Sequence, residues 1–283
     1  MLTRLPILKV RQVEALLKKF SLDVIASITA EDLGISRHTV NQWFNHWREA
    51  ILEHGRIAPR FAGEVEVDQT QLTGRGAKKN KFYRKHQEDA YGAPRNAEWK
   101  KFMEQRRKKK ELELKKSGKK PWKPVKAIGI MSRSGKVYTQ IIEDERRDTL
   151  MPIIYMVVEE GSTIYTDSWR SYGTLKEDKY QHKVVDHSKA FTNASGNHIN
   201  FIESFWSFAK RRLTKFNGLS KHRAILHLKE CEFRWNHGQG LGEKRWQFIM
   251  KNIREFAPLP KKSQKRKLTK HLKFPPIRKK LDL

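Results

Sequence analysis

The sequence has one cysteine and no long apolar run. With Cys231 alone, neither a disulfide framework nor a zinc ribbon built from CxxC pairs is possible. No segment reaches the run of about 18 apolar residues that a membrane-spanning helix needs, and the amino terminus lacks the apolar core of a signal peptide. These absences favour a protein of the reducing cytoplasm without a membrane partner.

Acidic residues are also scarce. The chain has 60 Lys and Arg against 31 Asp and Glu, a formal net charge of +29. Such a charge repels itself in a compact protein, so it indicates a polyanionic partner rather than a small-molecule substrate. We expect double-stranded DNA and a place close to the nucleoid of a prokaryotic cell; a membrane surface and a merely solvated basic shell are the alternatives.

Changes in composition divide the chain into three parts. Residues 1–60 have a helical pattern, residues 61–257 combine strands and helices, and residues 258–283 form a basic tail. A basic insertion at about 75–124 interrupts the second part, with nineteen Lys or Arg against six acids. Both basic segments are expected either to neutralise DNA phosphates or to be solvated without a specific role.

The pattern of residues 1–60 predicts a helix-turn-helix. Thr29 begins a TAED capping box that would start the first helix of the pair. Gly34 supplies the backbone freedom of the turn, and Ser36 is expected to cap the second helix. The apolar stripe of that second helix contains Val40, Trp43, Phe44 and Trp47.

Polar side chains occupy the opposite face of the second helix. They are Arg37, His38, Asn41, Gln42 and Asn45. Side chains of these types reach base edges and phosphates when a helix lies in the major groove. Small helical hairpins also occur as inert packing units, and the net charge of the chain favours the DNA-binding interpretation.

The segment EVEVDQT at 64–70 alternates apolar and polar residues, which predicts a strand with one buried face. Asp68 lies on the side of Glu64 and Glu66, opposite Val65 and Val67. The further expected elements are strands at 125–131, 137–142, 163–167 and 182–185, a helix at 149–160 with Pro152 in its first turn, and a helix from Asn200 onward.

Acids stand at three points of this order: on the first strand, at Asp167 after a later strand, and on the helix that follows. The order matches the ribonuclease H-like fold, an α/β fold with a mixed sheet flanked by helices, in which such carboxylates converge. Cleaving a phosphodiester requires an activated oxygen nucleophile and a stabilised leaving oxyanion, and two Mg²⁺ ions about 4 Å apart provide both. A single acid at a strand end, by contrast, is commonly a turn residue.

Four segments carry a family resemblance. They are EVEVDQT at 64–70, TIYTDSWRSY at 163–172, NHINFIESFWSFAKRRL at 197–213 and HLKECEFRWN at 227–236. Together they resemble the ISXO2-like domain of IS1595-family transposases. The resemblance implies an acid triad of Asp68, Asp167 and Glu203, with 35 residues between the last two. It also implies that these three carboxylates are both catalytic residues and ligands of Mg²⁺ or Mn²⁺, two ions in all.

The resemblance further implies a DNA contact at Lys210. Seven residues after Glu203, it lies about 700° around the helix and therefore on the same face; the neighbouring Arg211 and Arg212 are expected to join it. The sequence departs from many relatives in three ways: it has no zinc ribbon, it has Gln69 where an acid is common, and its basic insertion is longer.

Two polar residues before Glu203 are possible auxiliaries. Asn200 is expected to cap the helix rather than to act as a ligand, because an amide offers one neutral oxygen whereas a carboxylate also offers charge. His198 is expected to orient a phosphate or an acid rather than to bind zinc. Late on the last segment, Arg234 and Asn236 are interpreted as a packing and hydrogen-bonding element behind the site.

These observations predict a DNA transposase that binds terminal inverted repeats, cleaves strands with divalent metal and transfers them to target DNA. We expect it to act as a homodimer or a higher homo-oligomer on DNA. The alternatives are a non-catalytic DNA-binding regulator derived from a transposase and a ribonuclease H-like nuclease. A regulator has no need to keep three metal ligands, and a nuclease gives the first 60 residues no obvious purpose.

Overall fold

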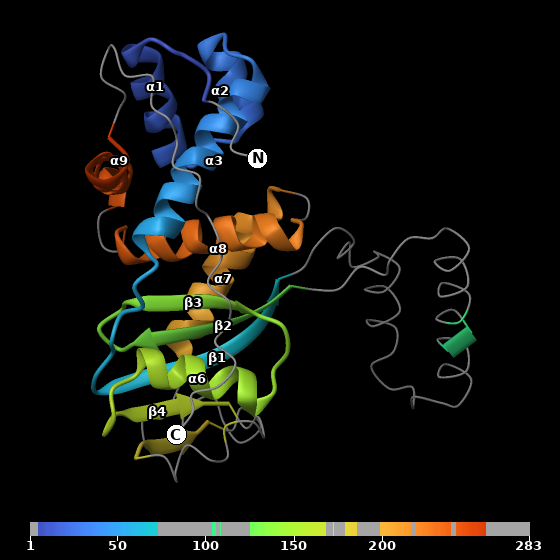
Figure 1. The fold of residues 1–283 in the computed structure, drawn as a ribbon, viewed down its shortest axis with the longest axis vertical. Helices are drawn as coiled ribbons and strands as arrows, with labels where there is room; N and C mark the ends of the chain where they lie inside the picture. Colours follow the sequence, from blue (N-terminus) through green and yellow to red (C-terminus); the bar gives the residue numbers. More distant parts are fainter. Residues whose placement is uncertain are drawn as a thin grey trace. The chain divides into compact units, whose positions relative to one another are not determined.

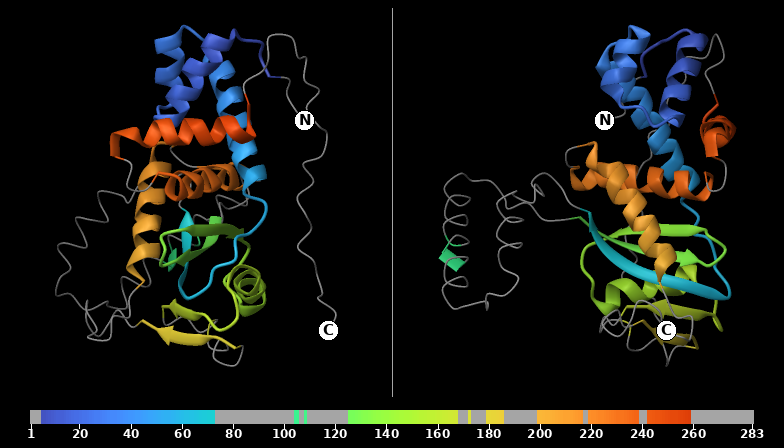
Figure 2. Two further views of the ribbon diagram at one scale, coloured as in Figure 1. Left: turned by 90° about the vertical axis from the view of Figure 1, so that its left-hand side faces the viewer. Right: turned by 180° about the vertical axis from the view of Figure 1, so that it is seen from behind.

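The computed structural model describes residues 5–72, 104, 105, 108, 125–167, 172, 179–185, 199–216, 219–238 and 242–258. The chain divides into two compact units, one formed by Met1–Arg56 with His237–Leu283 and the other by Ile57–Asn236. The first is helical and the second is a mixed α/β unit (Figures 1 and 2). In the described ranges, no helix is both long enough and apolar enough to cross a bilayer.

The basic insertion at about 75–124 and the tail at 258–283 lie almost wholly outside the described residues. Within the insertion only residues 104, 105 and 108 are described; they are helical, and Lys108 pairs with Glu104 at 3.1 Å. The roles expected for both basic segments therefore stay predictions.

The helical unit has four α-helices in its described part. They are α1 (Val10–Ser21), α2 (Ala26–Leu33), α3 (Arg37–His54) and α9 (Arg245–Phe256), the last preceded by the 3₁₀ turn η2 (Gly242–Lys244). The stripe expected on α3 is confirmed, since Val40, Trp43, Phe44 and Trp47 are all buried. The Phe20 ring of α1 lies 5.2 Å from the ring of Phe44 and 5.3 Å from that of Trp47, so aromatic packing between α1 and α3 forms the core.

The turn between α2 and α3 has the expected chemistry. Gly34 ends α2 with a φ of 60°, and the Ser36 hydroxyl accepts a hydrogen bond from the Thr39 amide at 3.1 Å. The expected capping box at Thr29 is wrong. Helix α2 begins three residues earlier, after the extended residue Ile25, and Thr29 is buried inside it with its amide bonded to the Ile25 carbonyl at 3.0 Å.

Helix α9 belongs to the helical unit, although its sequence position placed it in the 61–257 part. Its Arg254 guanidinium lies 3.3 Å from the Glu14 carboxylate of α1, and Lys18 of α1 lies 5.1 Å from the centre of the Trp246 ring. The α/β unit accordingly ends at Asn236. Local composition does not reveal this boundary, because the partners of α9 are more than 200 residues away in the sequence.

The α/β unit is built on a five-stranded sheet of order β3-β2-β1-β4-β5. Its elements are β1 (Glu64–Leu72), β2 (Val125–Ser132), β3 (Val137–Ile142), α6 (Arg147–Val157), β4 (Thr163–Thr166), β5 (Gln181–Val184), α7 (Asn200–Thr214) and α8 (Lys221–Asn236). Strands β1, β4 and β5 are parallel, and β2 is antiparallel to both β1 and β3. The mixed sheet flanked by helices is confirmed, with strand bounds within two residues of those expected.

The sheet has a hydrophobic cluster on each face. On one face, Val65 and Val67 of β1 pack with Leu150 and Ile154 of α6. On the other, strand residues such as Tyr165 pack with residues of α7 and α8. Figure 2 shows the ribbons of the sheet and its helices from two further sides. Helix α6 begins at Arg147 instead of 149, so Pro152 is its sixth residue and lies in the second turn, not in the first as expected.

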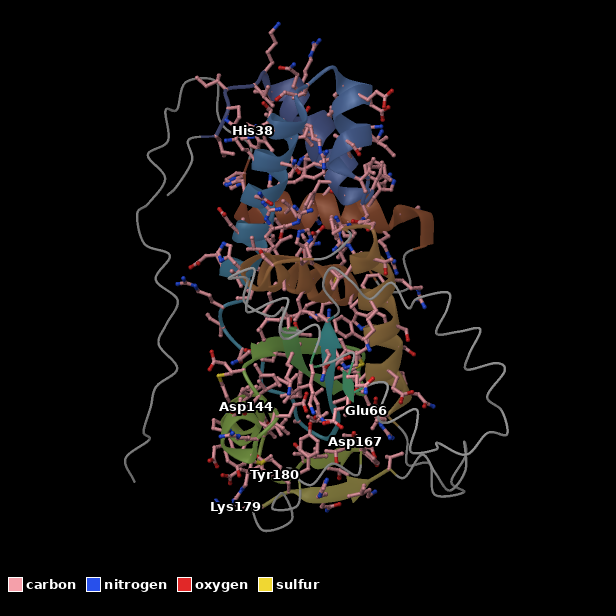
Figure 3. All side chains as sticks on the ribbon, turned by 90° about the vertical axis from the view of Figure 1, so that its right-hand side faces the viewer. His38, Glu66, Asp144, Asp167, Lys179 and Tyr180 are labelled. Atoms are coloured by element: carbon pink, nitrogen blue, oxygen red, sulfur yellow. The ribbon has the colours of Figure 1, made fainter. Side chains whose placement is uncertain are left out.

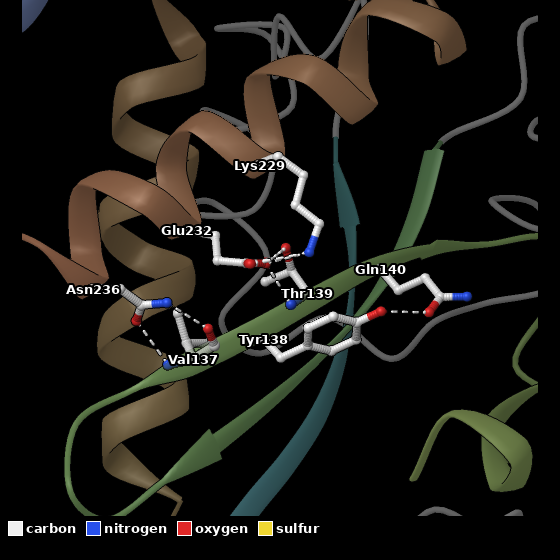
Figure 4. Close-up of polar contacts among 7 residues, drawn as sticks. All are labelled: Val137, Tyr138, Thr139, Gln140, Lys229, Glu232 and Asn236. Atoms are coloured by element: carbon white, nitrogen blue, oxygen red, sulfur yellow. Dashed lines mark hydrogen bonds and ion pairs between the residues drawn. The ribbon is translucent and has the colours of Figure 1, made fainter. Parts of the chain in front are cut away.

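Helix α8 lies along β3, which is an edge strand of the sheet (Figure 4). The Asn236 side chain accepts from the Val137 amide at 2.9 Å and donates to the Val137 carbonyl at 2.8 Å. Two residues along β3, the Thr139 amide donates to Glu232 at 2.7 Å. Asn236 therefore has the packing and hydrogen-bonding role expected of it.

Candidate active site

Asp68 and Asp167 are brought together by the register of two parallel strands. Glu64 of β1 is in register with Thr163 of β4, and the pairing continues to Val67 with Thr166. The next pair in this register is Asp68 with Asp167. Neighbouring strands lie about 4.8 Å apart, so the two acids are adjacent, Asp68 in the middle of β1 and Asp167 directly after the end of β4.

Both acids are on the face of the sheet that α7 covers. Side chains alternate along a strand, so Asp68 shares a face with Glu66, and Asp167 shares a face with Tyr165, which packs in the α7 cluster. Glu66 and Asp167 are labelled in Figure 3. The sequence interpretation placed Asp68 on this side correctly.

The third acid, Glu203, is an exposed residue in the first turn of α7. Its charge reaches Asp68. Burial raises the pKa of Asp68 to about 7, the negative charge of Asp167 adds to this rise, and that of Glu203 adds a smaller amount. Lys210, exposed on the same helix, acts in the opposite sense. The charges of Asp167, Glu203 and Lys210 therefore all act on the carboxyl group of Asp68.

The start of α7 is held by a residue of β1. The Glu66 carboxylate is fully buried and accepts a hydrogen bond from the Ile202 amide at 3.0 Å. The expectation that Asn200 caps the helix is wrong: Ile199 is the N-cap residue, and no side chain caps the helix from that position. Asn200 is the first helical residue and is exposed.

Gly129 of β2 allows α7 to approach the sheet. It is in register with Asp68, and a Cβ atom at this position would lie 2.6 Å from the Trp206 ring and 2.8 Å from Ile202 Cδ1. Any other residue would require the side chains of Trp206 and Ile202, or α7 itself, to shift. The sequence shows only a glycine within a strand, whose usual meaning is a bulge or a close approach of another segment.

A group of charged and aromatic residues flanks the acids, and sequence reasoning missed it. Arg133, in the turn between β2 and β3, pairs with Glu64 at 2.9 Å and lies 4.2 Å from the centre of the Tyr165 ring. The Tyr165 hydroxyl donates to Glu64 at 2.5 Å, and Lys183 of β5 lies 3.4 Å from the same hydroxyl. Strand parity was the one available signal, because it places Glu64 on the face of Asp68.

Tyr172 is a further residue that sequence reasoning missed. It is fully buried, and its hydroxyl donates to the side-chain carbonyl of Gln69. Burial raises the pKa of Tyr172 well above its ordinary value, and the charges of Asp68 and Asp167 add to the rise. Gln69 points to the opposite face from Asp68 and serves this hydrogen bond.

The basic residues expected on α7 have different fates. Lys210 and Arg211 are exposed. Arg212 is buried, and its guanidinium donates to the Glu230 carboxylate, which also accepts from Arg234 at 2.9 Å. The expectation of a DNA contact at Arg212 is therefore wrong, because Arg212 continues the buried face of α7 and pairs with α8.

The polar face expected on α3 is only partly free. Arg37, His38 and Asn41 are exposed, and Figure 3 labels His38 on the helical unit. Gln42 is half-buried. Asn45 is also half-buried and accepts a hydrogen bond from Arg48 at 3.2 Å, so it contributes to the packing of the unit. His198 lies outside the described residues.

The donor set of the three acids fits a hard divalent cation. Carboxylate oxygens are the ligands that Mg²⁺ and Mn²⁺ prefer. Asp68 is a carboxyl group with a raised pKa between two like charges, an environment that a cation would relieve. As the described residues stand, no three His, Cys, Asp or Glu are gathered closely enough to form a ready-made metal site.

Comparison with known proteins gives three results. The model of the ISXO2-like transposase domain matches residues 60–236. An uncharacterized transposase-like protein of Haemophilus influenzae is 43% identical over 104 residues, 37% of this chain and 84% of the relative. An uncharacterized protein in transposable element ISH50 of Halobacterium salinarum is 34% identical over 77 residues, 27% of this chain and 26% of the relative.

Among solved structures, the chain aligns with the simian T-cell lymphotropic virus intasome in complex with PP2A regulatory subunit B56 gamma. The TM-score is 0.34 and the identity 13%, over 76% of this chain and 61% of that one. The family match begins near the start of the α/β unit and ends at the last residue of α8. This chain belongs to the ISXO2-like transposase domain family.

Proposed function

We propose that this chain is the DNA transposase of its element, which binds the terminal inverted repeats, hydrolyses a phosphodiester at each end and joins the freed 3′-OH to target DNA. The observation that carries the proposal is the β1–β4 register, which sets Asp68 beside Asp167 under α7. The strand order β3-β2-β1-β4-β5 supports a ribonuclease H-like fold for the α/β unit.

We propose that Asp68, Asp167 and Glu203 hold divalent ions, Mg²⁺ or Mn²⁺. When bound, such ions lower the pKa of an attacking water or hydroxyl and neutralise charge on the leaving oxygen. The two strand acids are fixed by the sheet, whereas Glu203 comes from α7 and depends on where that helix is held. A carboxylate at Glu203 adds charge and two oxygens, which Asn200 does not offer.

Lys210 is proposed to bind a DNA phosphate next to the acids. It is exposed two turns after Glu203, and its charge acts on Asp68. A lysine at this point attracts the DNA backbone to a site whose carboxylates alone would repel it. Arg211, also exposed, is proposed to extend the same contact.

Sequence recognition is proposed for the helical unit. Helix α3 presents Arg37, His38 and Asn41 to solvent beside the α2–α3 turn, which supports a helix-turn-helix that reads the inverted repeats. Gln42 is half-buried and is proposed as a second base contact. Because an element has two ends, we propose that at least two copies assemble on DNA.

The catalytic proposal is tested on DNA that carries the ends of the element. Cleavage should require Mg²⁺ or Mn²⁺ and stop in excess chelator, and Asp167→Asn should abolish it while end binding persists. Glu160→Gln, an exposed acid after α6, is the matched control and should cleave at the wild-type rate. Robust cleavage in chelator, or by the Asp167 variant, would refute the metal mechanism.

The DNA-binding proposal separates sequence preference from strength. Replacing Asn41 and Gln42 by Ala should reduce discrimination between end DNA and random DNA, by about 1–3 kcal/mol for each base contact. Neutralising four lysines between 100 and 120 should weaken binding to all DNA and flatten its salt dependence. If the two variants behave alike in salt-titrated binding, this division of roles is wrong.

A further inference from the structure

Helix α7 begins without a cap of its own. The first amides of a helix have no partner within the helix, and a side chain just before it ordinarily accepts from one of them. The N-cap residue of α7 is Ile199, whose side chain has no acceptor. The first turn of α7 therefore needs an acceptor from elsewhere in the fold.

That acceptor is Glu66 of β1. Its Oε2 atom accepts from the Ile202 amide at 3.0 Å, and the Phe201 amide also donates to the carboxylate. A carboxylate that receives two amides at a helix N-terminus makes charge-assisted hydrogen bonds, and the helix dipole favours its charge. The carboxylate has no solvent exposure, so its bonds to α7 face little competition from water.

The other oxygen of Glu66 faces a positive charge. This atom, Oε1, lies 3.8 Å from the Nε atom of Arg133. Arg133 is in turn held by the Glu64 carboxylate and by the ring of Tyr165. Glu66 thus lies between the turn after β2, where Arg133 supplies a positive charge, and the first turn of α7, to which its Oε2 atom is hydrogen-bonded.

Glu66 links the segment that carries the strand acid Asp68 to the helix turn that carries Glu203. It stands two residues before Asp68 on the same face of β1, and its hydrogen-bond partner Ile202 immediately precedes Glu203. One buried carboxylate therefore sets the distance between the strand that carries Asp68 and the helix turn that carries Glu203. Displacing a reacting group by about 1 Å costs on the order of 100-fold in rate.

We infer that Glu66 is a positioning residue: it anchors the first turn of α7 on β1 and so places Glu203 against Asp68 and Asp167. The inference rests on the proposed function for the role of those three acids. The anchor acts through the reach of the Glu66 side chain to two backbone amides.

Two conservative variants separate reach from charge. Glu66→Asp keeps the charge but shortens the side chain by one methylene, which withdraws the acceptor from the Ile202 amide. Glu66→Gln keeps the length and one acceptor oxygen but removes the charge. If Glu66 is a positioning residue, Glu66→Asp should be impaired and Glu66→Gln should keep most of the function. If Glu66 is an extra metal ligand, Glu66→Gln should be the more impaired of the two.

The first readout is hydrogen exchange of the Phe201 and Ile202 amides. In the wild-type protein these amides should be protected, although amides in a first turn ordinarily lack partners. Glu66→Asp should speed their exchange at least tenfold and leave the amides of β3 unchanged, and Glu66→Gln should stay within threefold of wild type. If the Phe201 and Ile202 amides of the wild-type protein exchange without protection, the anchoring role of Glu66 is refuted. This measurement needs no variant, so it decides the question even if a variant fails to fold.

The second readout is Mn²⁺ binding, measured by electron paramagnetic resonance without DNA. Glu66→Asp should raise the half-saturating Mn²⁺ concentration about tenfold, and Glu66→Gln should raise it less than threefold. Glu160→Gln, the exposed acid after α6, is the control and should bind like wild type. A Gln variant as impaired as the Asp variant would contradict positioning by reach.

Failure of the proposed function is distinguishable from failure of this inference. If Asp68→Asn and Glu203→Gln bind Mn²⁺ and cleave DNA like wild type, the proposed metal site is wrong, and exchange at Phe201 and Ile202 alone then decides whether Glu66 anchors α7. If those two variants are inactive while Glu66→Asp matches wild type in exchange and in Mn²⁺ binding, the site stands and the positioning role is refuted.

Discussion

The two faces of β1 differ sharply. On the α6 face, Val65 and Val67 are fully buried in an apolar cluster. On the α7 face, Glu66 and Asp68 alternate with them, and burial raises the pKa of each carboxyl group to about 7. One strand thus gains stability on one side and keeps costly charges on the other. Such costs are common where a fold prepares a chemical site, and the apolar face offsets them.

The largest effect should come from Asp68→Asn, on the charged face. Removing a metal-binding carboxylate should lower the cleavage rate at least about 1,000-fold, equivalent to about 4 kcal/mol of transition-state stabilisation. Binding to element ends should change little, since the phosphate contacts remain. Single-turnover cleavage and a binding titration measure the two quantities. If Asp68→Asn cleaves within tenfold of the wild-type rate, the α7 face of β1 has no catalytic role that the α6 face lacks.

The same substitution should make the metal-free protein less sensitive to pH. The folded-state pKa of Asp68 is about 7 against an ordinary 3.8, so the folded state binds the extra proton between these values. Its contribution to stability is present below about pH 4, falls as pH rises and is lost above about pH 7. Between pH 4 and pH 8, the free energy of unfolding of Asp68→Asn should therefore rise by about 2–4 kcal/mol relative to that of wild type.

Denaturant unfolding of the metal-free proteins at several pH values checks this prediction. The pKa of Glu66 is raised as well, so the stability of the variant should still decrease to some extent as pH rises. Adding Mg²⁺ at pH 8 should stabilise wild type more than the variant, because a ligand stabilises the state that binds it. A variant less stable than wild type at pH 8 would show that the Asp68 charge is not costly.

On the apolar face, Val67→Ala should do the opposite of Asp68→Asn. Val67 has no exposed surface, so deleting two methyl groups leaves a cavity beside α6 and should lower the free energy of unfolding by about 2 kcal/mol. The cleavage rate at low temperature should stay within a few-fold of wild type. Loss of cleavage in a fully folded Val67 variant would mean that the two faces are not independent.

Gly129→Ala sharpens the comparison from the neighbouring strand. Its new methyl group would meet the Trp206 ring and the Ile202 side chain of α7, so we expect the helix to shift. Overpacking of this kind costs about 1–3 kcal/mol. Because α7 carries Glu203, Mn²⁺ affinity should fall as well. Unchanged Mn²⁺ affinity with reduced stability would show that Glu203 tolerates movement of its helix.

The smallest effect should come from Asn200→Ala. Asn200 is the exposed first residue of α7 and not its cap. The free energy of unfolding, measured by thermal denaturation, should therefore change by less than about 0.5 kcal/mol. Its cleavage rate should stay close to wild type. A loss of about 1 kcal/mol would indicate that Asn200 does cap the helix in solution.

The strands could be predicted from the sequence because their signal is local. The alternation around Asp68 and the apolar run before Asp167 both require a buried face, and that requirement is visible within a few residues. The side of β1 that carries Asp68 followed from the same alternation. What the alternation does not contain is the register of β1 with β4, which decides that the two acids meet.

Two of the errors came from partners that are distant in the sequence. Asn200 has the residue type of a cap, but the acceptor for the α7 amides is Glu66 on β1. Arg212 is basic and close to Lys210, but a buried acid of α8 pairs with it. Thr29 begins an acceptable capping box, yet it is buried within α2. At Asn200 and Arg212, tertiary packing overrode a local preference, whereas the error at Thr29 is local, because α2 begins three residues earlier at Ala26.

The arrangement of α8 on β3 limits how copies of this protein can associate. An edge strand with open amides invites strand addition, which joins sheets of separate chains and often leads to aggregation. Here the amides of Val137 and Thr139 are occupied by Asn236 and Glu232 of the same chain. A strand from another copy would have to displace α8 to pair there. The multimer that we propose on DNA is therefore assembled through surfaces other than this edge, and the β3 side of the sheet is protected against strand addition.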